Sequence, residues 1–125
     1  NTEVVQLTVN GKIISKGNTP VATVGQALTS VLGAITTSEG TDTAGTVVVS
    51  SGSQLSVAGE IANVQFSTPY GVAPKIVISG NNAKSAKLGA YVVRTPNGFK
   101  IMTDDPLSQN ETYSFDYIII EAQNL

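Results

Sequence analysis

Strand-length segments in which apolar and polar residues alternate, separated by turn residues, constrain the fold of this chain most strongly. The clearest lies near the C-terminus, where Tyr113, Phe115, Tyr117 and Ile119 fall on one side of an extended chain. Successive side chains of a strand point to opposite faces of a sheet, so this pattern predicts a strand with one buried face. Because Phe115 sits in the middle of that face, we expect it to belong to the core.

Similar segments recur along the chain, with turn residues about every ten positions. We expect strands near residues 46–50, 62–67, 75–79, 90–94, 99–102 and 112–120. Strands with one apolar face bury it most simply when two sheets pack face to face. The sequence therefore predicts an all-β fold, an antiparallel β-sandwich or jelly-roll-like domain with a short N-terminal β-hairpin or stem segment.

The segment from Val21 to Ile35 fits two structures. Val24, Leu28, Val31, Leu32 and Ile35 would share one face of a short helix. Glycines inside the pattern weaken such a helix by about 1 kcal/mol each, and β-branched residues are frequent. Helix and strand both remain open for this segment.

Residues 1–17 are predicted to form a separate N-terminal β segment, and residues 18–125 the β-sandwich domain. The dipeptide Asn10-Gly11 is typical of a tight hairpin turn, because both central residues of a type I′ turn need a positive φ. The stretch that ends at Pro20 reads as a joint between the two parts.

The N-terminal segment has apolar residues on both faces, because Val4 and Val5 are adjacent, as are Ile13 and Ile14. A two-stranded hairpin alone is marginal in water, and resting one face on the domain leaves the other exposed. Neighbouring chains bury both faces and cover the strand edges. We therefore expect a stem end or a donated strand; the alternative is a hairpin that completes the sandwich of its own chain.

Composition excludes several classes of function. Of the 125 residues only 13% are charged, the net charge is −2, and the Lys and Arg residues are scattered, which argues against nucleic acid as a partner. No apolar run approaches membrane-spanning length, so we expect no membrane insertion. Without His or Cys, the chain has no catalytic triad, imidazole site or thiolate site. We expect a protein that is not an enzyme and needs no cofactor.

Four residues are candidates for ligand binding: Tyr70, Tyr91, Arg94 and Asn97. Tyr70 falls in a turn between prolines, and Tyr91 begins the hairpin that carries Arg94 and Asn97. Exposed tyrosines beside Asn and Arg are suited to hold sugars, through stacking and planar hydrogen bonds. The alternative is that both tyrosines lie at sheet edges and cover the ends of the core.

Asp104, Asp105 and Glu111 lie in one acidic loop and form a weak candidate for a Ca²⁺ site, because Ca²⁺ prefers oxygen ligands. The simpler interpretation is a solvated loop, and we expect no metal to be needed.

Thr95-Pro96-Asn97-Gly98 predicts a tight hairpin turn between two strands. We expect Gly98 to occupy a position with positive φ, where a β-branched residue is badly strained.

Several stretches carry a family resemblance, and together they span about Val21 to Ala122. They are Gly40–Val49, Phe66–Ile78, Leu88–Val92 and Thr112–Tyr117. Their composition and turn spacing resemble the C-terminal β-domains of bacteriophage tail-fibre-like proteins and of fibre-like bacterial surface proteins. The opening residues Leu7–Ile13 resemble the repeats that precede such tips.

The resemblance implies a homotrimer on a virion tail fibre or at the cell surface, attached to a cell-surface glycan or protein. It also favours strand over helix between Val21 and Ile35. The first functional hypothesis is therefore a receptor-binding fibre tip or adhesin domain. The second is a structural subunit of a virion or extracellular filament, assembled by strand exchange with its fibre neighbours. A carbohydrate-active enzyme is the third, supported only by the presence of acidic residues.

Overall fold

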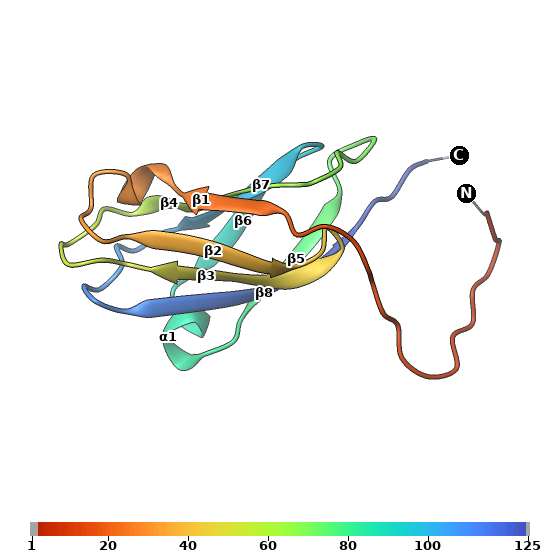
Figure 1. The fold of residues 1–125 in the computed structure, drawn as a ribbon, viewed down its shortest axis with the longest axis horizontal. Helices are drawn as coiled ribbons and strands as arrows, with labels where there is room; N and C mark the ends of the chain where they lie inside the picture. Colours follow the sequence, from red (N-terminus) through yellow and green to blue (C-terminus); the bar gives the residue numbers. More distant parts are fainter. Residues whose placement is uncertain (1–2, 125) are drawn as a thin grey trace.

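The computed structural model describes residues 3–124 and shows an antiparallel β-sandwich (Figure 1). The described residues form eight strands: β1 (Val21–Val24), β2 (Ile35–Gly40), β3 (Ala44–Ser50), β4 (Gly59–Gln65), β5 (Lys75–Gly80), β6 (Ala90–Thr95), β7 (Gly98–Thr103) and β8 (Thr112–Ile120). Sheet A has the strand order β1-β4-β7-β6, and sheet B has the order β2-β3-β8-β5. The predicted all-β sandwich is confirmed. No helix within residues 3–124 has the length and apolar character that crossing a membrane requires.

The core lies between the two sheets, and β8 supplies much of it. Its alternate residues Tyr113, Phe115, Tyr117 and Ile119 are all buried, which confirms the predicted inner face of this strand. The ring of Phe99, from sheet A, lies between the rings of Phe66 and Tyr117, with centroids 6.0 and 5.5 Å away. The other buried apolar residues are Ala27, Leu28, Val47, Val49, Ile61, Ala62, Val64, Leu88, Ile101 and Leu107.

The segment with two possible structures forms β1, then a short 3-10 helix, η1 (Gln26–Leu28), and then the start of β2. Leu28 is buried in the core, whereas Leu32 is exposed, so the segment does not present the single apolar face of a regular helix. Gly25 marks the change of direction. A Cβ atom there would lie 2.4 Å from the Glu60 carbonyl oxygen, so the close approach of β4 requires glycine.

The predicted N-terminal hairpin is wrong for the residues that the structure describes. Residues 3–20 contain no strand, and residues 3–19, which we call the arm, are exposed and extend away from the sandwich (Figure 1). The chain bends at Asn10-Gly11, where Gly11 has a φ of 121°. Asn10-Gly11 therefore does bend the chain, but the two flanking segments lack the packing surface that would hold them together as a hairpin.

The turn between β6 and β7 forms as predicted, but Gly98 has a different role from the one expected. Its φ is not positive. A Cβ atom at Gly98 would instead lie 2.1 Å from the Val64 carbonyl oxygen on β4. Glycine is therefore needed here because two strands approach closely. The Thr95 hydroxyl closes the turn by accepting hydrogen bonds from the amides of Asn97 and Gly98, both at 3.2 Å.

Candidate functional site

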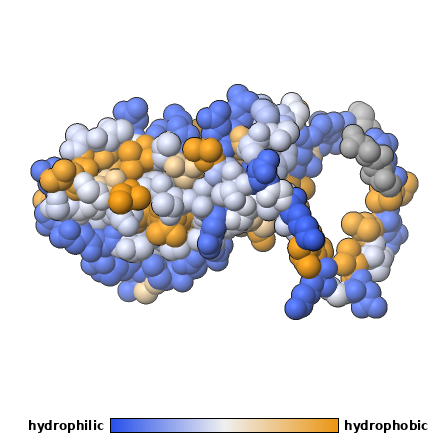
Figure 2. All heavy atoms as spheres, viewed as in Figure 1, coloured by the Kyte–Doolittle hydropathy of each residue, from blue (hydrophilic) through white to orange (hydrophobic). Residues whose placement is uncertain are grey.

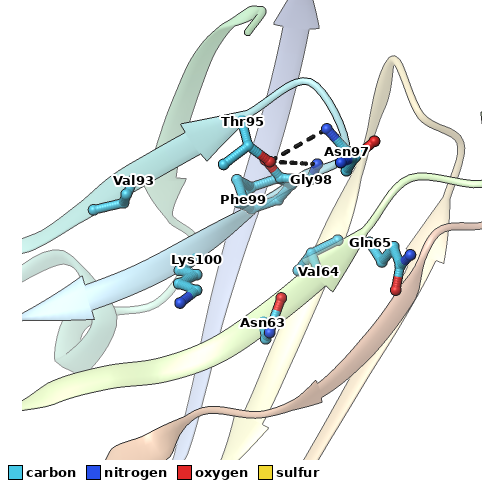
Figure 3. A pocket seen from close by; sticks show the side chains of 9 residues that line it. All are labelled: Asn63, Val64, Gln65, Val93, Thr95, Asn97, Gly98, Phe99 and Lys100. Atoms are coloured by element: carbon cyan, nitrogen blue, oxygen red, sulfur yellow. Dashed lines mark hydrogen bonds between the residues drawn. The ribbon is translucent and has the colours of Figure 1, made fainter. Parts of the chain in front are cut away.

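A shallow groove runs over β4, β6 and β7 on the outer face of sheet A, with a volume of about 210 Å³ (Figure 3). Its lining residues are Asn63, Val64, Gln65, Val93, Thr95, Asn97, Gly98, Phe99 and Lys100. The strand ladder sets two rows of residues side by side here, Asn63–Lys100–Val93 and Gln65–Gly98–Thr95. Because Gly98 has no side chain, the second row is hollow at its centre, and this hollow forms the floor of the groove.

The chemistry of the groove is mainly that of amides. Asn63, Gln65 and Asn97 are exposed, and each side-chain amide both donates and accepts hydrogen bonds. Val93 adds an apolar surface. A few polar groups around an apolar floor are typical of sites that fix the orientation of a small ligand. The arrangement suits a neutral ligand rich in hydroxyl groups.

Lys100 also lines the groove, and its positive charge is neutralised by the carboxylate of Glu60. Its ammonium group lies 3.1 Å from a carboxylate oxygen of Glu60, a buried residue at the start of β4. The second oxygen of that carboxylate accepts a hydrogen bond from the Gln26 amide at 3.1 Å. The ion pair holds the Lys100 side chain towards Glu60 and leaves this surface with little net charge.

The four predicted ligand-binding residues do not come together. Asn97 lines the groove. Tyr91 is exposed on the same outer face, in the next row of the ladder from Val93, and does not line the groove. Arg94 points to the other face of β6, where its guanidinium donates to the Pro74 carbonyl at 2.9 Å.

Tyr70, the fourth of these residues, supports a turn. Its hydroxyl donates to the Asp42 carbonyl at 2.7 Å, and its ring packs edge-on against Phe66 with centroids 4.9 Å apart. Burial is the main reason that the pKa of Tyr70 is raised above its usual value. The contacts of this side chain are those of a residue that covers one end of the core, which is the alternative interpretation of the sequence.

The carboxylates of Asp104, Asp105 and Glu111 do not come together to form a metal site. Among the described residues, no three His, Cys, Asp or Glu side chains form a group that could hold a metal ion. Glu111 pairs instead with Lys84 at 2.6 Å, and Thr103 donates to the backbone carbonyl of Asp105. Asp104 is exposed.

Of the residues that line the groove, only Asn97 was predicted to bind a ligand; the long polar side chains of Asn63, Gln65 and Lys100 were missed. The alternation of residues 62–67 does place Asn63 and Gln65 on the outer face of their strand. The alternation does not show that β4 pairs with β7. This pairing brings Asn63 and Gln65 beside Lys100 and the turn at Asn97.

Comparisons of the chain with protein-family models, with curated proteins and with solved structures gave no match.

Proposed function

We propose that this chain is a non-enzymatic receptor-binding domain, the tip of a trimeric phage tail-fibre-like protein or surface adhesin, displayed on a virion or at the cell surface. The groove on sheet A carries the proposal. It offers three amide side chains, one lysine with a balanced charge and an apolar wall on a rigid three-strand platform. Cell-surface glycans are the ligand class that this chemistry suits best.

The distribution of reactive groups supports a binding role over a catalytic one. The chain has no His and no Cys. Glu60 is the buried carboxylate nearest the groove, and both of its oxygens already have partners. In glycoside hydrolysis the acid and the base are usually carboxyl groups, and they must reach the substrate. The groove therefore has groups that orient a ligand, and the Glu60 carboxylate beside it has no free oxygen.

Binding to an array of cell-surface glycans tests this proposal. We expect the full chain to bind a subset of glycans, and Asn63→Ala and Gln65→Ala each to weaken that binding about tenfold, equivalent to about 1.4 kcal/mol. Thr37→Ala, an exposed change on the outer face of sheet B, is the matched control and should leave binding unchanged. Glycan binding that persists in both groove variants would contradict the proposed site.

The arm favours a second candidate function, a structural subunit of a virion or extracellular filament. Its six apolar side chains stand in water in the single chain, which is unusual for a surface that has no partner. The two functions are compatible, because a fibre tip both assembles with its neighbours and presents a binding face.

A further inference from the structure

The arm carries a set of apolar side chains that its own domain does not bury. They are Val4, Val5, Leu7, Val9, Ile13 and Ile14. Leu7 and Ile14 are each 74% exposed and Ile13 is 83% exposed. Figure 2 shows the arm as apolar and polar spheres standing apart from the body of the sandwich. Val5, Leu7 and Val9 would share one face of an extended chain, so this part of the arm has the pattern of a strand that lacks a sheet.

Sheet B carries an apolar patch at its open edge. Val77 on β5 pairs directly with Ile118 on β8, and Ile120 is two residues further along the same face of β8. These three residues, which we call the β5–β8 patch, are 68%, 58% and 65% exposed. Because β5 is the last strand of sheet B, one side of its backbone has no ladder partner among the described strands.

The other sheet edges are less suited to receive a strand. At the β1 and β2 edges, Thr19 donates to the Gly40 carbonyl at 2.8 Å and Ser38 donates to the Pro20 carbonyl, so the two edges already hold each other. At the β6 edge, Tyr91 and Val93 are less exposed than the residues of the β5–β8 patch.

We infer that the arm of one copy docks along the β5 edge of a second copy and covers the β5–β8 patch. This rests on the second candidate function and names its partner and surface. In this arrangement Val5, Leu7 and Val9 lie on the outer face of the extended sheet, beside Val77 of β5. The free backbone groups of the edge gain hydrogen-bond partners at the same time, as in other cases of strand addition.

The amount of surface is compatible with a stable contact. Burying one Val, Leu or Ile side chain removes roughly 60–120 Å² of apolar area from water. Full burial of the six arm residues and the three patch residues would remove roughly 500–1,000 Å² from water, which is the upper limit for the apolar part of the contact. With the backbone and polar side chains of the arm added, the contact reaches the range of about 1,200 Å² and above in which specific interfaces lie.

The charges of the arm and of the surface around the β5–β8 patch are also complementary. Lys12 and Lys16 flank Ile13 and Ile14 in the arm, and neither takes part in an ion pair with the other described residues. Asp116 precedes the patch along the outer face of β8, and Glu121 follows it. Lys75, beside Ile120, is a cation on this face, so the arm lysines are best placed towards the Asp116 side.

The arm and the end of β8, which carries part of the β5–β8 patch, lie at the same end of the molecule. The arm leaves the sandwich where Ser15 meets Thr41, with 2.9 Å between their hydroxyl oxygens, in the turn between β2 and β3. The Ile119 amide donates to the Thr43 carbonyl of that turn at 2.8 Å, so the end of β8 is its neighbour. A contact of this kind joins different surfaces on the two copies, and it closes when the copies form a ring.

The chain has no cysteine, so engineered thiols test the contact directly. Leu7→Cys chains labelled with ¹⁵N are mixed with unlabelled Val77→Cys chains under mild oxidation, and mixed disulfide dimers are counted by mass spectrometry. The control replaces Val77→Cys with Ile35→Cys, another exposed residue (58%, against 68% for Val77), on β2 at the other edge of sheet B. Melting curves of the single variants check that each is folded.

We expect mixed Leu7–Val77 dimers at about ten times the yield of Leu7–Ile35 dimers or more, because a disulfide forms only where the two Cα atoms come within about 7 Å. Equal yields for the two pairs would overturn the inference. So would a Leu7→Cys/Val77→Cys double variant that closes its disulfide within one chain while the mixture gives none. Either failure leaves glycan binding at the groove untouched, so it is distinguishable from failure of the proposed receptor-binding function.

Discussion

Asp42 and Ser67 join two turns of the sandwich at the end from which the arm leaves. The Asp42 carboxylate accepts hydrogen bonds from the Ser67 amide at 2.9 Å and from the Ser67 hydroxyl at 2.8 Å. The Thr68 amide donates a third, at 2.9 Å. One side chain in the turn between β2 and β3 thus fixes the loop between β4 and β5, and with it the support for Tyr70.

Replacing this carboxylate should loosen that end of the molecule. We expect Asp42→Ala to lower the free energy of unfolding by about 1–2 kcal/mol, because hydrogen bonds to a charged group are lost while exposed donors regain water. Asp42→Asn keeps one acceptor oxygen and should cost about half as much. Urea unfolding measures both, with Asp104→Ala as an exposed acidic control. A loss for Asp42→Ala no larger than for the control would contradict the role of Asp42.

Gly98→Ala tests the close approach of β7 to β4. The added Cβ atom meets the Val64 carbonyl oxygen at 2.1 Å, so the strands must separate. We expect a loss of roughly 1–3 kcal/mol in the free energy of unfolding. Gly17→Ala is the control, since the nearest atom to its Cβ lies 3.9 Å away on Thr41. If both variants melt at the wild-type temperature, the strand contact at Gly98 is looser than described.

Phe115→Ala tests the core. The side chain is 1% exposed in the middle of β8, and its removal leaves a cavity, so we expect a loss of about 3–5 kcal/mol. Thr112→Ala, at an exposed position of the same strand, should stay within about 0.5 kcal/mol of wild type. A loss below about 1 kcal/mol at Phe115 would show that the wrong face of β8 has been assigned to the core.

The raised pKa of Tyr117 predicts that the folded state loses stability at alkaline pH. Burial, followed by the nearby Asp42 and Tyr70, raises the pKa of Tyr117 from 10.0 to about 12. Its hydroxyl donates to the Thr41 carbonyl, which requires the proton. A raised pKa means that the folded state holds the proton more tightly than the unfolded state, so this stabilisation is complete below pH 10 and is lost as the pH rises towards about 12.

Unfolding in urea at several alkaline pH values measures this effect, with Tyr117→Phe as the matched variant. We expect the variant to be less stable at neutral pH, since it lacks the hydrogen bond, and to lose less stability between pH 10 and about 12 than the wild type. Parallel curves for the two proteins would mean that Tyr117 does not titrate as described.

The sequence was most informative where one strand face is buried. The alternation around Phe115 and around Val64 predicts both strands and their inner faces, because a strand that packs on a core must keep a period of two. It also identified the turn at Gly98. It could not show why glycine is needed there, because the atom that excludes a side chain belongs to Val64, a residue brought close only by strand pairing.

Local signals were misleading where tertiary partners decide the outcome. Asn10-Gly11 has the composition of a hairpin turn and does bend, but a hairpin needs a surface on which to pack its apolar faces, and the single chain provides none. The groove was only partly predictable for a related reason. Its residues come from β4 and from the hairpin of β6 and β7, and only the sheet order brings Asn63 beside Lys100.

Multi-angle light scattering of the full chain tests most directly the claim that this sandwich works as part of an assembly. We expect a mass of three times the 12.9 kDa of one chain at micromolar concentration, and a fall to a single chain when residues 1–16 are deleted. The β-rich circular dichroism spectrum of the shortened chain should show that the sandwich itself remains. A mass of 12.9 kDa for the full chain, with a single-chain mass and the same melting temperature after the deletion, would contradict both the trimer and the docking of the arm.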